Sequence, residues 1–521
     1  MKPEVADRFT KKLIDTYGNC NTKKAQEISD HIVTALNNAA LDVIPSKDKK
    51  FTKEIWKDDE IFNNLLSDRA SVSKSTEEYK NITKLIKKRI RKLRNEKLSL
   101  EASNINKKAN QREIEELYRN FKNNDLTFQT GTQKQKCDLS DLKKYFEGHF
   151  NVPLSEMEPD ELLRAPNYIT KLQEIKFEGI DTKAPTAEEI VKQIKSLKGG
   201  KSANDVPAEY LKHAIAHKCL IDDFVRLFAD IWETKKVPKT WSHTKLKTIW
   251  KGSTKGKVTD PTAYRGIQIG ATLCKLLVKI ILTRINRWYE EQLADQQQGF
   301  RSGRGTAEGI YLLKKLQQVT RYRGKSCYVL FVDLSSAFDH VNRKWMFKTI
   351  MQRLSIHNDK TIFQLLKSIY EYTTTEMIEN KDEVFEISVG VRQGGPESPS
   401  LFDLYIDYIL RVFIHEAKRQ GIKFTRLQYK IPSLATLPNE FGLGKCGYFD
   451  FSWIGYADDL VLAFDDLSSL GKGLELLNAT LKRFGMKLNA SKTKTMIFNH
   501  GGDSYPSTIV NLDSKSIDNV K

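Results

Sequence analysis

The sequence predicts a mixed α/β (α+β) fold, in which a helical N-terminal region precedes a region of alternating strands and helices. Two stretches support this prediction. The apolar run "CYVLFV" at residues 327–332 ends directly in Asp333, which is the pattern of a buried central strand with a carboxylate at its carboxyl end. The stretch "WIGYADDLVLAF" at 453–464 predicts two short strands joined at an Ala-Asp-Asp turn.

The N-terminal region, residues 1–125, is charged and has helical periodicity. In "KNITKLIKKRIRKLRNEK", which begins at Lys80, the apolar residues are spaced for one face of a helix and basic residues fill the rest. The apolar residues are Ile82, Leu85, Ile86, Ile90 and Leu93. The basic face is interpreted equally well as a solvated surface or as a contact with nucleic acid.

The sequence of residues 126–180 predicts a linker with short helices. A new helix is expected in "TAEEIVKQIKSLKGG", where Thr186 and Glu189 form a capping box and Gly199-Gly200 marks the end. Further on, "GVRQGGPESPSLFDLYIDYILRVF" places Gly394 and Gly395, which permit close backbone approach, just before an apolar helix.

The overall composition suits an intracellular protein with a polyanionic partner. Lysine and arginine number 85 against 66 acidic residues, which gives a formal charge of +19. Nucleic acid fits this charge, with a membrane surface as the rival. The chain has no apolar run of about 18 residues and no apolar N-terminal signal, so we expect neither a membrane-spanning segment nor secretion, and we favour nucleic acid over a membrane as the partner. Its six cysteines contain no CxxC pair and indicate neither disulfides nor a structural zinc site.

Three aspartates, Asp333, Asp458 and Asp459, stand at predicted strand ends or tips. Such a set is what a two-metal phosphoryl-transfer centre needs, because two Mg²⁺ ions about 3.5–4 Å apart are held by few carboxylates together with substrate phosphates. Taken alone, the Asp pair is better explained by the exposed turn of a plain hairpin, since aspartate is common in turns.

Six stretches in order resemble the motifs of a reverse transcriptase of non-LTR (LINE-like) retrotransposons. They are "DPTAYRGIQIG", "QQQGFRSGRGT", "FVDLSSAFDHV", "GVRQGGPESPSLF", "YADD" and "FGMKLNASKTKTMIF". The resemblance covers roughly residues 185–500 and implies a right-hand polymerase with fingers at 181–324 and a partial palm at 325–521. The chain departs from the family in having Gly266 and Gly305 where proline and serine are usual.

The resemblance also implies roles for particular residues. Asp333, Asp458 and Asp459 would hold the two Mg²⁺ ions, and Lys492 would act on the leaving pyrophosphate. The implied nucleotide-binding residues are Lys251, Arg265, Phe338, Gln393 and Gly394, and the implied template-binding residues are Arg301 and Arg304. Phe338 would lie beneath the incoming sugar and exclude a 2′-hydroxyl.

The implied activity is RNA-directed DNA polymerisation, with an RNA template, a DNA primer or target, and dNTPs as partners. We expect the protein in the nucleus, the cytoplasm or both. The thumb and the endonuclease of such polyproteins are not seen in the sequence, so we expect a truncated or partial polyprotein that extends a primer poorly by itself. Three alternatives stay open: a non-catalytic RNA-binding relic, an RNA-dependent RNA polymerase, and a globular protein with coincident motifs.

Overall fold

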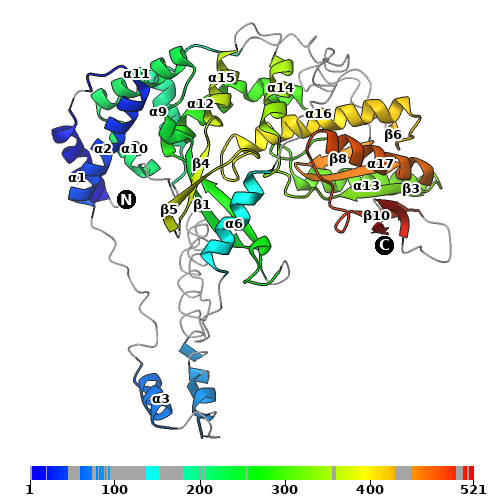
Figure 1. Ribbon diagram of the computed structural model, residues 1–521, viewed down its shortest axis with the longest axis horizontal. Helices are drawn as coiled ribbons and strands as arrows, with labels where there is room; N and C mark the ends of the chain where they lie inside the picture. Colours follow the sequence, from blue (N-terminus) through cyan, green and yellow to red (C-terminus); the bar gives the residue numbers. More distant parts are fainter. Residues whose placement is uncertain are drawn as a thin grey trace. The chain divides into compact units, whose positions relative to one another are not determined.

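The protein is described by a computed structural model in which two compact units are distinguished, Met1–Val43 with Gln135–Lys521 and Ile44–Lys134 (Figure 1). The described residues are 3–18, 20–44, 59–72, 78–79, 81–86, 88–89, 92–93, 137–152, 180–199, 202, 206–252, 256–354, 360–378, 380–425, 427–428, 448–449, 451–499, 508–512 and 515–520. The predicted N-terminal region, residues 1–125, is therefore divided, because its first 43 residues belong to the larger unit.

The smaller unit contains α3 (Glu60–Ser71), which Asp59 caps by accepting a hydrogen bond from the Phe62 amide at 2.8 Å. Arg89 pairs with the same carboxylate at 2.7 Å. Phe62 and Ile86 form a small buried cluster, against which Ile82 packs. The predicted apolar helix face is thus partly confirmed: Leu85 is 51% exposed, and Ile90 lies outside the described residues.

Helices form one side of the larger unit: α1 (Pro3–Thr16), α2 (Ala25–Val43), α9 (Ala187–Ser196), α10 (Ala208–Ala214), α11 (Lys218–Thr234) and α12 (Thr272–Gln292). In α2, Ile28, Ile32 and Leu36 recur at helical spacing and are fully buried. The predicted helix start is confirmed, since the Thr186 hydroxyl accepts from the Glu189 amide at 3.3 Å at the start of α9, whereas the Glu189 carboxylate of the expected capping box binds Arg284.

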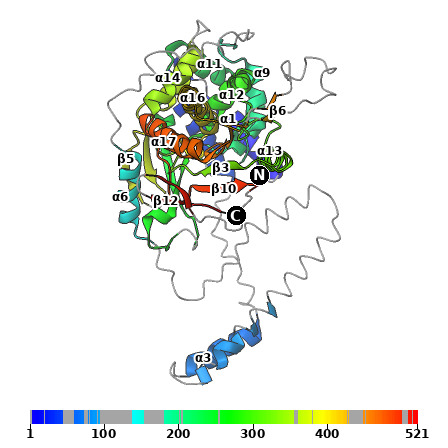
Figure 2. The same cartoon turned by 90° about the vertical axis from the view of Figure 1, so that its right-hand side faces the viewer.

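The first sheet has the strand order β2-β1-β4-β5 and is formed by β1 (His243–Trp250), β2 (Tyr264–Ile269), β4 (Thr374–Met377) and β5 (Asn380–Glu386). Only the β1–β4 pair among these is parallel. Helix α6 (Leu139–Phe150), from the predicted linker, lies beside β5 in both views (Figures 1 and 2). Its Phe146 and Phe150 share one buried cluster with Leu246 and Phe385. This sheet takes strands from both sides of the predicted boundary at 324/325.

The second sheet is antiparallel throughout, with the order β10-β3-β9-β8. Its strands are β3 (Cys327–Val332), β8 (Trp453–Tyr456), β9 (Asp459–Phe464) and β10 (Lys494–Phe498). Ala463 packs in a cluster with Leu316 of α13 (Thr306–Tyr322), whereas Phe464 points to Gly473 of α17 (Leu467–Arg483). Because successive side chains of a strand point to opposite faces, the two helices cover the two faces of the sheet.

The remaining elements are α14 (Arg343–Leu354), α15 (Thr361–Ile369), α16 (Ser398–Arg419), and the short strand pairs β6 (Leu427–Gln428) with β7 (Tyr448–Phe449) and β11 (Thr508–Leu512) with β12 (Lys515–Asp518). The predicted apolar helix after the glycines is α16, which has a proline in its first turn. The mixture of helices and sheets agrees with the predicted fold class. Within the described residues, no helix has the length and apolar character needed to cross a membrane.

Candidate active site

The three predicted aspartates lie at one edge of the second sheet. Val332, the last residue of β3, pairs with Leu460, so Asp333 and Asp459 extend these neighbouring strands at the same edge. Tyr456 pairs with Asp459 and closes the β8–β9 hairpin around Ala457 and Asp458. The predicted central strand and the predicted hairpin are both confirmed, although Asp459 begins a strand and only Asp458 lies in the turn.

The turn is conformationally demanding. Ala457 has a φ of +57°, in the left-handed region that residues with a Cβ seldom adopt. Its amide donates to Gln297 Oε1 at 3.0 Å, and the same oxygen accepts from the Gly299 amide at 3.0 Å. A Cβ on Gly299 would lie 2.5 Å from the Ala457 nitrogen. The segment around Gln297 therefore fixes the hairpin turn through close backbone contact.

This contact continues along β8 as strand-like pairing. The Gln298 amide donates to the Gly455 carbonyl at 2.8 Å, and the Gly455 amide donates to the Gln296 carbonyl at 3.0 Å. Sequence reasoning missed these supporting residues. The only signal was the "QQQG" run itself, and nothing in it indicates which strand it would join.

The electrostatics of the site are those of crowded carboxylates. Burial raises the pKa of Asp458, and the charges of Asp459 and Asp333 raise it further, while Arg265 lowers it. Burial and the charge of Asp333 also raise the pKa of Asp459, against the effect of Lys492. The three carboxylates are thus near enough to repel one another, although their oxygens do not all lie within 4.8 Å of one another.

The donor set fits a hard divalent cation. It consists of carboxylate oxygens alone, which are the ligands that Mg²⁺ prefers. A divalent ion would also relieve the repulsion that raises the two pKa values. Asp333, Asp458 and Asp459 are accordingly the residues that could hold a metal here.

Lys492 stands directly beside this cluster. Its Nζ is 3.3 Å from Asp333 Oδ2, and the side chain is 56% exposed. The backbone brings the two together, because the Asn489 amide donates to the Asp333 carbonyl at 2.8 Å. The loop before β10 therefore places an ammonium group next to the end of β3, and the action of Lys492 on a leaving group stays a prediction.

Arg265 lies on β2, opposite Ile249 of β1, and is exposed. It is close enough to Asp458 to lower the pKa of that carboxyl group, so the first sheet contributes a cation to the edge of the second. Among the described residues, no hydrogen bond or ion pair engages its guanidinium group.

Lys251 follows β1, and its Nζ donates to the Thr262 carbonyl at 2.8 Å. Burial and the nearby charge of Arg265 lower the pKa of Lys251, with a smaller effect of the same sign from Lys492. Lys251 is thus near enough to Arg265 and Lys492 to feel their charges, and Arg265 and Lys492 in turn act on the aspartates, so the site combines cations with carboxylates.

Phe338 is half-buried five residues after Asp333. Its ring stacks on Phe402 of α16, with the centroids 4.4 Å apart and the planes inclined by 14°. Phe300 approaches the same ring edge-on at 6.4 Å. The stacking on Phe402 fixes the position of the ring.

Gln393 is held from two sides. Its Nε2 donates to Asp339 Oδ1 at 2.8 Å, and its carbonyl accepts from the Gln268 amide of β2 at 2.7 Å. The other Asp339 oxygen meets His149 of α6 at 3.1 Å. Gly394 has a φ of +116°, and a Cβ there would lie 2.7 Å from the Gln268 carbonyl oxygen, so the predicted close backbone approach is confirmed.

The two predicted template arginines are engaged within the chain. Arg301 has a side chain only 3% exposed, bonded to Glu290 and to the carbonyls of Ala294 and Gln297. The Arg304 guanidinium donates to the Asp295 backbone carbonyl at 2.7 Å and pairs with the Asp295 carboxylate at 3.0 Å. The Arg304 side chain is 29% exposed. Arg301 thereby stabilises the segment that supports the hairpin, and contact of either arginine with a template stays a prediction.

Comparison with known proteins adds a family to this geometry. Residues 251–518, just over half of the chain, match the family described as "Reverse transcriptase (RNA-dependent DNA polymerase)". This range contains every residue predicted for the site, from Lys251 to Lys492.

Curated relatives point the same way. The chain is 28% identical over 240 residues to the "Retrovirus-related Pol polyprotein from type-2 retrotransposable element R2DM" of Drosophila melanogaster, covering 45% of this chain and 20% of the relative. It is 28% identical over 275 residues to the type-1 element R2 polyprotein of Popillia japonica, covering 52% of this chain and 34% of the relative. A "Probable RNA-directed DNA polymerase from transposon BS" of Drosophila melanogaster is 33% identical over 163 residues, which are 30% of this chain and 17% of the relative. The matched regions thus span about a third or less of the length of these relatives.

Proposed function

Because this chain belongs to the reverse transcriptase (RNA-dependent DNA polymerase) family, we propose that it copies RNA into DNA as the polymerase portion of a non-LTR retrotransposon polyprotein. One observation supports this most directly: Asp333 at the end of β3 and Asp458 and Asp459 at the β8–β9 hairpin share one sheet edge, where burial and the neighbouring carboxylate charges raise the pKa values of the last two. Its substrates would be an RNA template, a DNA primer and dNTPs, met in the nucleus or the cytoplasm.

In the proposed reaction, the 3′-hydroxyl of the primer attacks the α-phosphorus of a dNTP and pyrophosphate leaves. Two Mg²⁺ ions held by the three aspartates would activate the hydroxyl and stabilise the charge on the leaving group. Asp333 follows β3 and Asp459 begins β9. Because these two strands are paired, the sheet sets the distance between the two residues.

Arg265 and Lys251 would bind the triphosphate. The fork of a guanidinium group matches phosphate oxygens, and no described partner competes for that of Arg265. Lys492 would give a proton to the pyrophosphate or orient it, since its ammonium group lies beside Asp333 and is mostly exposed. Its contact with Asp333 keeps it close to the reacting atoms.

Phe338 and Gln393 would select and seat the nucleotide. The Phe338 ring, fixed by its stacking on Phe402, would lie under the sugar and leave no room for a 2′-hydroxyl. Gln393 and Gly394 would lie against the sugar and base, with Asp339 and the β2 backbone holding them in place. Arg304 would contact the template strand. We propose that residues 181–324 contribute the fingers and residues 325–521 a partial palm, with β4 and β5 of the second range completing the sheet that β1 and β2 begin.

The test is the addition of a single nucleotide to an oligo(dT) primer on poly(rA), with dTTP or UTP and Mg²⁺. We expect addition of dTTP in clear preference to UTP. A preference for UTP would indicate an RNA polymerase instead, and no addition by a chain that still binds RNA would indicate a non-catalytic relic.

The same assay tests Phe338. Phe338→Ala should raise the ratio of the UTP to dTTP specificity constants by about tenfold or more, because the steric exclusion of the 2′-hydroxyl is removed. Phe300→Ala is the matched control, since it removes a ring that touches Phe338 but leaves the Phe338–Phe402 stack. An unchanged ratio in Phe338→Ala would mean that the ring serves packing alone.

A further inference from the structure

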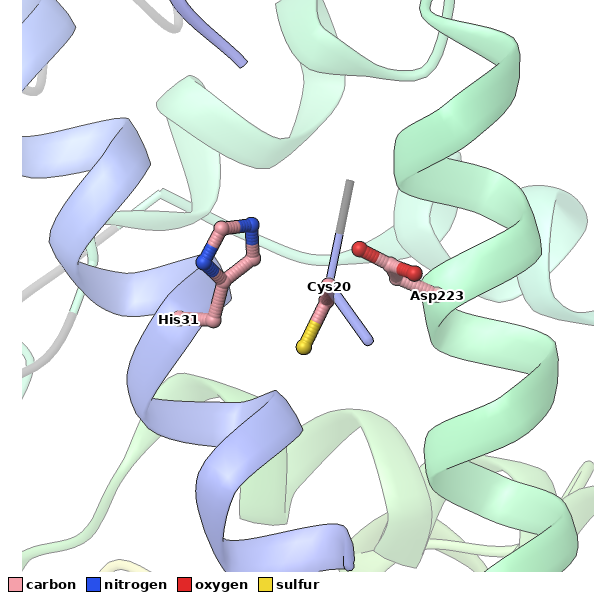
Figure 3. Close-up of side chains that lie close together, drawn as sticks. All are labelled: Cys20, His31 and Asp223. Carbon is pink, nitrogen blue, oxygen red and sulfur yellow. The ribbon is translucent and has the colours of Figure 1, made fainter. Parts of the chain in front are cut away.

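A second group of possible metal ligands lies in the N-terminal helices. Cys20 follows α1, His31 is on α2 and Asp223 is on α11, and Figure 3 shows their side chains converging. One ligand atom from each lies within 4.8 Å of the others. These are residues 20, 31 and 223 of the larger unit, and none of them belongs to the polymerase site.

The histidine presents one ring nitrogen to the other two side chains. Figure 3 shows that the Nε2 edge of the His31 ring faces Cys20 and Asp223, whereas Nδ1 lies on the far side of the ring. Nε2 lies 3.0 Å from the Gly18 carbonyl oxygen, which can only accept, so Nε2 carries the proton of the neutral ring. Metal binding displaces a proton from its ligand, so a cation bound at Nε2 would replace this proton and leave the neutral tautomer that is protonated on Nδ1.

The other two ligands are buried. Cys20 is 8% exposed and is a free cysteine, and in the described part of the chain no hydrogen bond of its thiol is seen. Asp223 is 3% exposed, and accepts from the Tyr17 hydroxyl at 2.6 Å and from Arg226. A carboxylate has about four lone-pair sites, so these two donors leave capacity for a metal.

We propose that Cys20, His31 and Asp223 bind one Zn²⁺ ion. A thiolate, an imidazole and a carboxylate are the three ligand types of zinc, whereas Mg²⁺ takes oxygen ligands and would not select a thiol. The thiolate and the carboxylate together balance the charge of the ion. Water completes the tetrahedron.

The bound ion joins the segment after α1 and the start of α2 to α11. Without it, the same residues would be a hydrogen-bonded network of Tyr17, Asp223 and Arg226 with a buried thiol beside it. Linear spacing gave no indication of zinc because Cys20 and His31 stand eleven positions apart and the third ligand comes from α11. The two interpretations differ in one measurable property, the bond between sulfur and metal.

The test uses Co²⁺ as a spectroscopic probe on the metal-free 521-residue chain. A thiolate ligand gives Co²⁺ an intense near-ultraviolet charge-transfer band, which oxygen ligands such as the active-site aspartates do not give. We expect this band at one equivalent of Co²⁺, and its loss when one equivalent of Zn²⁺ is added. Chain purified without chelator should also retain close to one zinc.

Variants assign the band to the site. Cys20→Ser should abolish it, while Cys219→Ser, which changes an exposed cysteine of α11, should keep it. His31→Gln should weaken Co²⁺ binding by at least about tenfold, since a ligand is lost. Absence of the band in the unmodified chain, or its persistence in Cys20→Ser, would overturn the proposal whether or not a variant folds poorly.

Discussion

Two groups of side chains in the larger unit differ in how the negative charge of their aspartates is balanced. On α16, Asp407 is fully buried and pairs with Arg353 at 2.9 Å and Arg411 at 2.8 Å. Although burial acts to raise the pKa of Asp407, these arginines lower it overall. At the sheet edge, Asp458 and Asp459 have raised pKa values, because burial and the repulsion between carboxylates outweigh Arg265 and Lys492.

The difference separates structural from functional carboxylates. The α16 cluster satisfies its charge within the chain, so it needs no ligand and contributes to folding. The sheet-edge cluster keeps an excess of negative charge that a cation from solution can neutralise, so it is destabilising by itself and useful for binding. Both groups are built around aspartate carboxylates, and the partners of those carboxylates distinguish the two groups.

The largest expected effect tests the functional side of this comparison. Asp333→Asn or Asp458→Asn should reduce the rate of nucleotide addition more than about a thousandfold. Each substitution removes a negative charge that would hold Mg²⁺, and the bound ion would stabilise the transition state by several kcal/mol. Folding and RNA binding should be preserved. Asp465→Asn, an exposed aspartate just after β9, is the control. Near-normal addition by either active-site variant would contradict the assignment.

The reverse pattern is expected for the structural cluster. Asp407→Asn should lower the free energy of unfolding by about 3–5 kcal/mol, because it leaves the buried Arg353 guanidinium without its anion. Urea unfolding followed by circular dichroism measures this. If Asp407→Asn were as stable as the unmodified chain, the ion pairs of Asp407 would not contribute to the stability of the fold.

Gln297 gives a smaller effect that sharpens the comparison, because it acts on the functional cluster only through the hairpin backbone. Gln297→Ala should lower the rate constant of addition by about tenfold, the worth of one buried hydrogen bond, with RNA affinity unchanged. Gln298→Ala is the matched control, since its side chain donates to the Asp295 carbonyl and not to the hairpin. Rapid-quench kinetics measures the rate constant of nucleotide addition separately from the binding of RNA. Equal effects of the two variants would argue against this role.

The most gradual expected effect, spread over several pH units, concerns Asp403, which lies one turn before Asp407 on α16 and forms no ion pair among the described residues. Burial raises its pKa to about 8, so the folded state holds a proton that the unfolded state releases near pH 4. Between these values the stability of the unmodified chain should fall with rising pH by up to about 1 kcal/mol per unit relative to Asp403→Asn. Unfolding curves at several pH values measure the difference. A constant difference would show that Asp403 is ionised when folded.

Much of the site could be predicted from the sequence because its signals are local. The apolar run before Asp333, the turn at Asp458 and the glycines before α16 each specify their own conformation, and the order of the motifs specifies the family. The match to the reverse transcriptase family confirms that resemblance. The residue roles that it implies are predictions for the experiments above.

What could not be predicted depends on contacts between distant segments. Arg301 was expected at a template, but Glu290 of α12 and nearby carbonyls surround its guanidinium group. The parallel pairing of β1 with β4 joins His243 to Thr374, across the predicted domain boundary. Charge and spacing in the sequence do not show which segments will meet.

One departure from the family pattern acquires a meaning from the fold. A Cβ at Gly266 would lie 2.8 Å from Phe146 Cε1 and 2.9 Å from Leu246 Cδ1. The lack of a side chain at this position of β2 therefore leaves room for the Phe146 ring of α6. The sizes of the side chains at these positions are therefore coupled. A relative that carries proline at the position of Gly266 is expected to have a smaller side chain at the position of Phe146 or Leu246, so these positions should covary among relatives.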